Sequence, residues 1–269
     1  MKHRFFHPLW LLLLSLPLHF AGLSAQKQNS STIPESLLNR PERGLVASDG
    51  FAPESEGPGL DRSNGGTGFI LPWELGGFNA RSADNFKVLT NSIPGASVRT
   101  TGGCVTSAPT AAISGLHRHL EDTLLPLPVG TSVWYISILF RPSEPLGKGA
   151  FNGFFGLTLD DEIFIGKPGD GAVNEWVIEG RGGENQVASG KRLAAGRTDV
   201  LVVRVDYNRP RRLSLWVNPA GRTTEPAKPD AVHEGLPSSI GRIGLYSTGG
   251  FMADELRVGR TYADVMPAP

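Results

Sequence analysis

Apolar and polar residues alternate along much of this chain, with a period of two. Across residues 200–207, apolar side chains occupy every second position, and Arg204 and Asp206 lie between them. Residues 212–217 repeat the pattern, with the apolar positions separated by Arg212, a serine and Trp216. A period of two places alternate side chains on opposite faces of a β-strand. The two segments therefore predict a pair of strands joined by a turn.

Further short apolar segments extend this prediction to most of the chain. Residues 133–140 are apolar at almost every position, which is typical of a strand covered on both faces. The other predicted strands are residues 154–159, 162–165, 240–246 and 252–258. Only residues 111–121 and 185–195 have a composition that could hold a short helix.

Composition supports a β-sandwich and excludes one class of partner. The chain has 34 glycines and 21 prolines among 269 residues, and they are dispersed, as in a fold with many turns. No repeat of fixed length is present, which disfavours propellers and solenoids. The net charge is zero, so the chain lacks the basic field that nucleic-acid binding requires.

The first 25 residues have the pattern of a secretory signal peptide. Lys2 and Arg4 precede an apolar segment over residues 5–20, and small residues follow up to Ala25. The alternative, a membrane anchor, is disfavoured because prolines interrupt a segment already shorter than the ~20 residues of a membrane span. We therefore predict a signal peptide over 1–25, a flexible linker over 26–45 and one β-domain over 46–269.

This organisation predicts a secreted or periplasmic protein without a membrane span after the signal is removed. The chain has one cysteine, Cys104, which cannot form an internal disulfide. In an oxidising compartment such a cysteine is either buried or bridged to another molecule, and the buried alternative is favoured.

Several motifs resemble those of a known family. They are Asp49-Gly50-Phe51, the glycine-rich turn at 64–69, the strand 133–137, and the closing segment 251–259 with its Ala-Asp-Val tail. Together they resemble exported bacterial proteins with LamG-like, concanavalin A-like jelly-roll domains, although Phe69 and Tyr262 stand where tryptophan is expected. The resemblance spans about residues 46–267. It implies an all-β, concanavalin A-like jelly-roll sandwich of two antiparallel sheets, and it specifies the fold far better than the function.

Catalytic patterns are not recognisable. Hydrolases of this fold carry Glu-x-Asp-x-x-Glu on one strand, and that spacing does not occur here. Asp160, Asp161 and Glu162 form the densest acidic group, which we interpret as a solvated hairpin turn. His117 and His119 would share one face of a strand, as two metal ligands do, but without a third ligand nearby the hypothesis of surface residues is favoured.

One candidate binding surface follows from the strand pair described above. Trp216, Arg204, Asp206 and Arg212 are predicted to lie on its polar face. An exposed tryptophan ring packs against sugar C–H groups, and polar neighbours orient the hydroxyls, so these residues are candidates for carbohydrate binding. The alternative is that Trp216 packs on the aliphatic part of Arg204 across the sheet.

A structural calcium ion is the one cofactor that the sequence indicates. Asp254 falls among alternate apolar positions of the last strand, where a carboxylate needs a partner. The resemblance implies that an aspartate at this position ligates calcium together with a residue of the first strand, here Asp49. The alternative is that Asp254 is hydrogen-bonded at a turn or paired with an arginine.

The sequence thus predicts an exported, non-catalytic jelly-roll module that binds glycan or another extracellular polymer. Its predicted partners are an extracellular polysaccharide or a surface protein, not nucleic acid or a membrane. Two alternatives remain open: a diverged glycoside hydrolase or polysaccharide lyase, and a structural surface protein without a small ligand.

Overall fold

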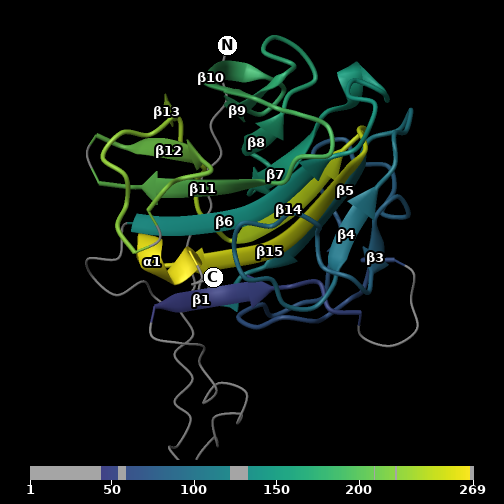
Figure 1. Cartoon of the computed structure of the whole chain (residues 1–269), viewed down its shortest axis with the longest axis horizontal. Helices are drawn as coiled ribbons and strands as arrows, with labels where there is room; N and C mark the ends of the chain where they lie inside the picture. Colours follow the sequence, from purple (N-terminus) through teal and green to yellow (C-terminus); the bar gives the residue numbers. More distant parts are fainter. Residues whose placement is uncertain (1–43, 54–58, 122–132, 209, 222, 267–269) are drawn as a thin grey trace, which may run out of the picture. The chain divides into compact units, whose positions relative to one another are not determined.

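Two antiparallel β-sheets packed face to face make up the fold (Figure 1). The structure is a computed structural model that describes residues 44–53, 59–121, 133–208, 210–221 and 223–266. The predicted concanavalin A-like jelly-roll sandwich is confirmed. The predicted signal peptide and most of the predicted linker lie outside the described residues. No helix among the described residues is long and apolar enough to cross a membrane.

The first sheet has eight strands and contains both the first and the last strand of the fold. Its path is β13 (Ala231–His233), β12 (Arg212–Val217), β11 (Asp199–Asp206), β6 (Val133–Pro142), β15 (Phe251–Gly259), β4 (Cys104–Ser107) and β3 (Lys87–Leu89), and β1 (Leu45–Asp49) also pairs with β15. The predicted adjacency of the chain's first and last strands is therefore confirmed.

The second sheet has seven strands. Its path is β10 (Glu184–Arg192), β9 (Glu175–Gly180), β8 (Ile163–Lys167), β7 (Phe155–Leu159), β14 (Arg242–Ser247), β5 (Ser114–His119) and β2 (Glu74–Leu75). The only helices among the described elements are the short η3 (Phe151–Gly153) and α1 (Tyr262–Val265).

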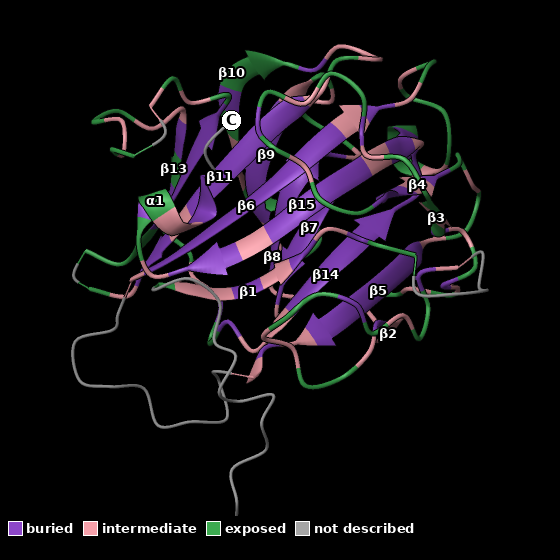
Figure 2. Ribbon diagram, turned by 60° about the horizontal axis from the view of Figure 1, so that its bottom comes forward, coloured by how far each residue is buried: buried purple, intermediate pink, exposed green. Residues whose placement is uncertain are grey.

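The main hydrophobic core lies between the two sheets. Buried positions dominate the central strands, and exposed positions gather on β10 and on the loops (Figure 2). On β11 the predicted alternation is confirmed, because Leu201, Val203 and Val205 all belong to this core. A second apolar cluster lies on the outer face of the eight-stranded sheet. It includes Leu139 and Cys104, so the prediction of a buried cysteine is also confirmed.

The two segments considered for short helices are strands instead. Residues 114–119 form β5 between β14 and β2, and residues 184–192 form β10 at the edge beside β9. In both cases backbone pairing with a neighbouring strand prevails over weak local preference, as is common for short segments. The hairpin between β7 and β8 was predicted correctly, and Asp160 and Asp161 both adopt the positive φ of a tight turn.

A β-bulge interrupts β15 at its buried acidic residues. The pairing with β6 shifts between Asp254 and Arg257, and Glu255 has a φ of 51°. The extra residue in a bulge moves the following side chains to the opposite face. Asp254 consequently lies opposite Leu139 on the outer face, whereas Leu256 points into the main core. The prediction that Asp254 shares a face with Leu256 and Val258 is therefore wrong.

Candidate functional site

The outer face of the seven-stranded sheet carries a groove of about 780 Å³. Thr158 of β7, Phe164 of β8 and Tyr246 of β14 point into it from the sheet, because their neighbours in sequence point into the core. Loops before β7 and between β8 and β10 contribute the walls. The sheet thus supplies a rigid floor, and the loops supply the sides.

Aromatic rings cover much of this groove. Phe154 is central: its ring lies 5.0 Å from Tyr246, 6.0 Å from Phe164 and 6.5 Å from Phe151, measured between centroids. Phe78 adds a fifth ring and packs against the cluster of Phe154, Phe164 and Tyr246. The lining is therefore apolar and flat over part of its length, which suits the C–H faces of a sugar ring.

Phe151 is the most exposed aromatic residue of the groove, at 66%. It belongs to a turn in which Phe151, Asn152 and Gly153 all have positive φ, between 50° and 62°. Such a backbone is strained for a bulky side chain and persists only where neighbours hold it. The Asn152 side chain donates to the carbonyl of Gly169 at 2.8 Å, and Lys167 Nζ donates to the carbonyl of Asn152 at 2.5 Å. The fold thus supports an exposed aromatic ring at the groove.

The polar groups that line the groove include one buried carboxylate, Glu179. Its carboxylate accepts a hydrogen bond from Gln186 Nε2 at 2.7 Å, and the residue is 8% exposed. Burial raises the pKa of Glu179, and the Gln186 bond opposes that shift only in part. Arg181 lies over the ring of Phe78, with 3.9 Å between its guanidinium carbon and the ring centroid. The groove therefore combines aromatic surface with a buried acid, an amide and a cation.

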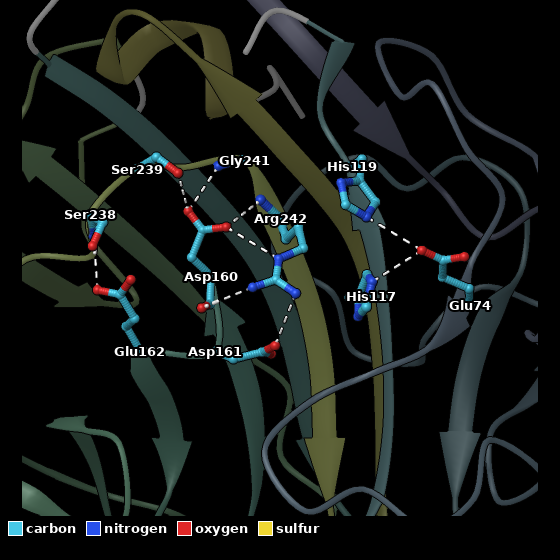
Figure 3. Close-up of polar contacts among 10 residues, drawn as sticks. All are labelled: Glu74, His117, His119, Asp160, Asp161, Glu162, Ser238, Ser239, Gly241 and Arg242. Atoms are coloured by element: carbon cyan, nitrogen blue, oxygen red, sulfur yellow. Dashed lines mark hydrogen bonds and ion pairs between the residues drawn. The ribbon is translucent and has the colours of Figure 1, made fainter. Parts of the chain in front are cut away.

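The turn between β7 and β8 borders this groove and is more ordered than the sequence predicted. Asp160 accepts hydrogen bonds from Ser239 and from the backbone N–H groups of Gly241 and Arg242 (Figure 3). The Arg242 side chain points to this turn and pairs with Asp161 at 3.3 Å. Interpreting the acidic turn as merely solvated is therefore wrong for Asp160, whose side chain is 10% exposed.

The predicted carbohydrate surface lies on the other sheet. Trp216, Arg204, Asp206 and Arg212 do share the outer face of the eight-stranded sheet, as predicted. However, Trp216 is 3% exposed, and its indole N–H donates to the carbonyl of Pro226 at 3.1 Å. The expectation of an exposed tryptophan ring is therefore wrong: segments distant in sequence cover it.

The three polar neighbours of Trp216 are engaged to different degrees. Arg204 pairs with Asp206 at 2.6 Å and with Glu225 at 3.2 Å. Arg212 is exposed at the end of β12. Carbohydrate binding by these residues stays a prediction.

The predicted calcium residues, Asp49 and Asp254, both have protein donors. Asp49 accepts from Phe51 N–H at 2.8 Å, from Trp73 Nε1 at 2.9 Å and from Arg118 at 2.9 Å. Asp254 accepts from the N–H groups of Ile93 at 3.0 Å and of its neighbour Glu255 at 2.7 Å. These contacts are the kind that the alternative hypothesis expects. Calcium binding at Asp49 and Asp254 stays a prediction.

The residues of the groove are those that sequence reasoning missed. Phe151 comes from η3, whereas Glu179 and Arg181 lie on either side of the last residue of β9, and each is unremarkable in its own segment. One signal was present, since Phe151 stands in the glycine-rich stretch 147–153 outside any alternating segment. An aromatic residue in a turn, away from the core pattern, is a candidate for ligand contact.

Comparison with known proteins assigns neither a family nor a function to this chain. No family model matches the chain, and no curated protein is similar to it. Similar solved structures include an endo-β-1,4-glucuronan lyase from Trichoderma reesei, with 14% identity and a TM-score of 0.44 over 72% of this chain and 96% of the lyase.

Two further structures are similar at the same level. They are the carbohydrate recognition domain of Emp47p (11% identity, TM-score 0.37, 67% of this chain and 91% of that one) and a carbohydrate esterase of the Shiga toxin-encoding bacteriophage phi24B (13%, 0.40, 69% and 88%). At these identities and TM-scores the likeness carries no information on ligand or activity.

Proposed function

We propose that this chain is an exported, non-catalytic module of LamG-like type that binds a glycan or another extracellular polymer. The binding site in this proposal is the groove on the outer face of the seven-stranded sheet. Export rests on the signal-like pattern of residues 1–25, and the LamG-like assignment rests on the motifs of the sequence.

One observation carries the proposal: an exposed aromatic ring and a buried carboxylate line the same groove. Phe151 offers a flat apolar surface, and Glu179 with Gln186 offers hydrogen-bonding groups in the same lining. Binding sites for sugars need both, because the C–H faces pack on a ring and the hydroxyls require directional partners. On the outer face of the other sheet Trp216 is buried, so this tryptophan does not supply an exposed ring there.

The test is affinity electrophoresis of the protein through gels that contain a panel of neutral, acidic and amino-sugar polysaccharides. We expect at least one polymer to retard the wild type, and the Phe151→Ala variant to bind about two- to tenfold more weakly, as loss of one aromatic contact would cause. Val232→Ala is the matched control, because Val232 is 41% exposed on the other sheet. Arg212→Ala tests the surface predicted from the sequence.

Each outcome of this test has a defined meaning. Equal retardation of Phe151→Ala and the wild type, with weakening in Arg212→Ala, would move the site to the eight-stranded sheet. Retardation by no polymer of the panel would contradict the proposal and favour a structural surface protein.

A second function, glycan cleavage, is favoured by the environment of Glu179. A buried carboxyl group with a raised pKa at a groove is suited to donate a proton to a leaving group. The assay is release of reducing ends or of unsaturated sugars from any polymer that binds. Binding without release supports the non-catalytic proposal, whereas release that is lost in Glu179→Gln would replace it with cleavage.

A further inference from the structure

A group of potential metal ligands lies on the seven-stranded sheet outside the groove lining. His117 and His119 are alternate residues of β5 and point to the same outer face, as predicted from their spacing. Glu74 of the two-residue strand β2 pairs directly with His117. Backbone pairing thus brings a carboxylate to two imidazoles from a position 43 residues away in sequence.

Both imidazoles approach the same carboxylate oxygen. The Nε2 atoms of His117 and His119 lie 3.2 Å and 3.3 Å from Glu74 Oε1 (Figure 3). The ligand atoms of the three residues all lie within 4.8 Å of one another. An ion about 2.0–2.2 Å from each of two imidazole nitrogens and a carboxylate oxygen fits between atoms at this spacing after small side-chain adjustments.

The surroundings fix one histidine and leave an open side. His117 is 8% exposed, and a Cβ on Gly76 would lie 1.5 Å from its Nδ1 atom, so the ring is packed against the backbone there. This packing leaves Nε2 as the atom that faces Glu74. The side chains of Glu74 and His119 are 47% and 32% exposed, so an ion has access from solvent and a free coordination position.

Two arginines next to the histidines, Arg118 and Arg242, are directed away from Glu74. Arg118, which separates the two histidines in sequence, points to the opposite side of the sheet and pairs with the buried Asp49. Arg242, paired opposite His119 across the sheet, is directed toward the β7–β8 turn (Figure 3). There it is balanced by Asp160 at 3.5 Å and Asp161 at 3.3 Å. The charge of each arginine is therefore balanced by carboxylates other than Glu74.

We propose that Glu74, His117 and His119 bind one divalent transition-metal ion of the zinc class. Two imidazoles with one carboxylate form a ligand set suited to zinc and to neighbouring first-row ions, and three protein ligands leave a position for water or for a bound group. The inference goes beyond the proposed polymer binding and does not depend on it.

The competing explanation is a purely structural hydrogen-bonded group. In that case Glu74 would accept from both histidines, and no ion would be required. The two explanations differ in one measurable respect: only a metal site takes up a stoichiometric ion through these three residues.

The experiment is equilibrium dialysis of the tag-free protein against zinc, with cobalt as a spectroscopic probe. We expect one zinc ion per chain and a visible d–d absorption band when cobalt replaces zinc. Glu74→Gln and His119→Ala should each weaken zinc binding at least about tenfold, since even the loss of a group that only orients a ligand costs that much. Glu121→Gln is the matched control, because it removes a carboxylate two residues beyond His119 and should leave zinc binding unchanged.

Thermal melting without zinc keeps the comparison interpretable. Glu74 is about half exposed on a two-residue strand, so Glu74→Gln should melt as the wild type does in the absence of metal. Zinc should then raise the melting temperature of the wild type and of Glu121→Gln only. Equal zinc binding by the wild type, Glu74→Gln and His119→Ala, or no stoichiometric binding by the wild type, would overturn the proposal.

Discussion

The outer faces of the two sheets differ in how far other segments of the chain cover them. On the eight-stranded sheet, residues such as Trp216, Tyr135 and Leu139 pack under α1 and under loops to form a second apolar cluster. On the seven-stranded sheet, Phe151 is exposed and a groove stays open. Both faces alternate polar and apolar residues in sequence. The comparison teaches that alternation identifies the face of a strand but does not say whether another segment covers that face.

Polar atoms on the covered face show how the covering is held. Ser137 donates to the carbonyl of Val265 at 2.6 Å, and the hydroxyl of Tyr262 donates to the carbonyl of Gly221 at 2.7 Å. With the bond from Trp216 to Pro226, these contacts tie α1 and the loop after β12 to the sheet. The three polar groups named here are thereby satisfied, which spares them the energetic penalty of an unpaired buried group.

The largest effect on the free energy of unfolding should come from removing a buried side chain of the covered outer face. We expect Trp216→Ala to lower the free energy of unfolding by ~3–5 kcal/mol, because it removes a buried ring and leaves a cavity. Phe151→Ala on the open face should cost less than ~0.5 kcal/mol, as exposed positions usually do. Urea denaturation followed by tryptophan fluorescence and circular dichroism measures both. Similar costs for the two variants would contradict the distinction between the faces.

The strands were predictable because local alternation and their final pairing agree. Residues 133–140 are apolar on both faces in sequence, and β6 is indeed buried between the main core and the second cluster. The burial of Trp216 could not be predicted from its own strand, because the residues that contact it, Pro226 and Tyr262, come from other segments. The third potential metal ligand was missed for the same reason: Glu74 meets His117 only through β2, a strand of two residues.

A second prediction concerns the pH dependence of stability that the buried carboxyl group of Asp254 causes. Burial raises the pKa of Asp254 from 3.8 to about 7, and the charges of Glu255 and Asp49 add to this shift. The folded protein therefore holds this proton more tightly than the unfolded chain does. The resulting stability is complete below about pH 4 and is lost as the pH rises through about 7.

The free energy of unfolding of the wild type should consequently fall by ~1–3 kcal/mol more than that of Asp254→Asn over this pH range. Urea denaturation in calcium-free buffer at a series of pH values measures the difference. Asp49 and Glu179 also have raised pKa values, but the wild type and Asp254→Asn both contain these residues, so their contribution to the pH dependence is common to the two proteins. Parallel curves for the two proteins would show that Asp254 does not titrate in this range.

The same pair of proteins, the wild type and Asp254→Asn, also tests the predicted calcium site. If the predicted ion binds at Asp49 and Asp254, millimolar calcium should raise the melting temperature of the wild type at neutral pH and leave that of Asp254→Asn unchanged. An equal response of both proteins would assign Asp254 to hydrogen bonding alone. The neighbouring carboxylate Glu255 cannot serve as an exposed control, because it is 4% exposed and accepts a hydrogen bond from the Thr101 hydroxyl.

The smallest effect concerns the turn that borders the open face. We expect Asp160→Asn to cost ~1–2 kcal/mol, because the N–H groups of Gly241 and Arg242 and the hydroxyl of Ser239 share its carboxylate. Asp161→Asn, which loses only a partly exposed ion pair, should cost less than ~1 kcal/mol. Asparagine tolerates the positive φ at both positions, so the difference reports the contacts. Thermal melting of the two variants measures this difference. Equally small costs would mean that both residues are solvated turn charges.

The order of the strands also determines when this protein can fold. β14 joins β7 to β5 in one sheet, and β15 joins β6 to β4 in the other, so the last two strands of the chain are central in both sheets. Each sheet therefore exists as two separate halves until residues 242–259 have been synthesised. Such non-local pairing is slow, and the unpaired edges of β6 and β7 are open to other chains in the meantime. We expect this domain to remain unfolded until β14 and β15 have been synthesised and to depend on chaperones during that interval.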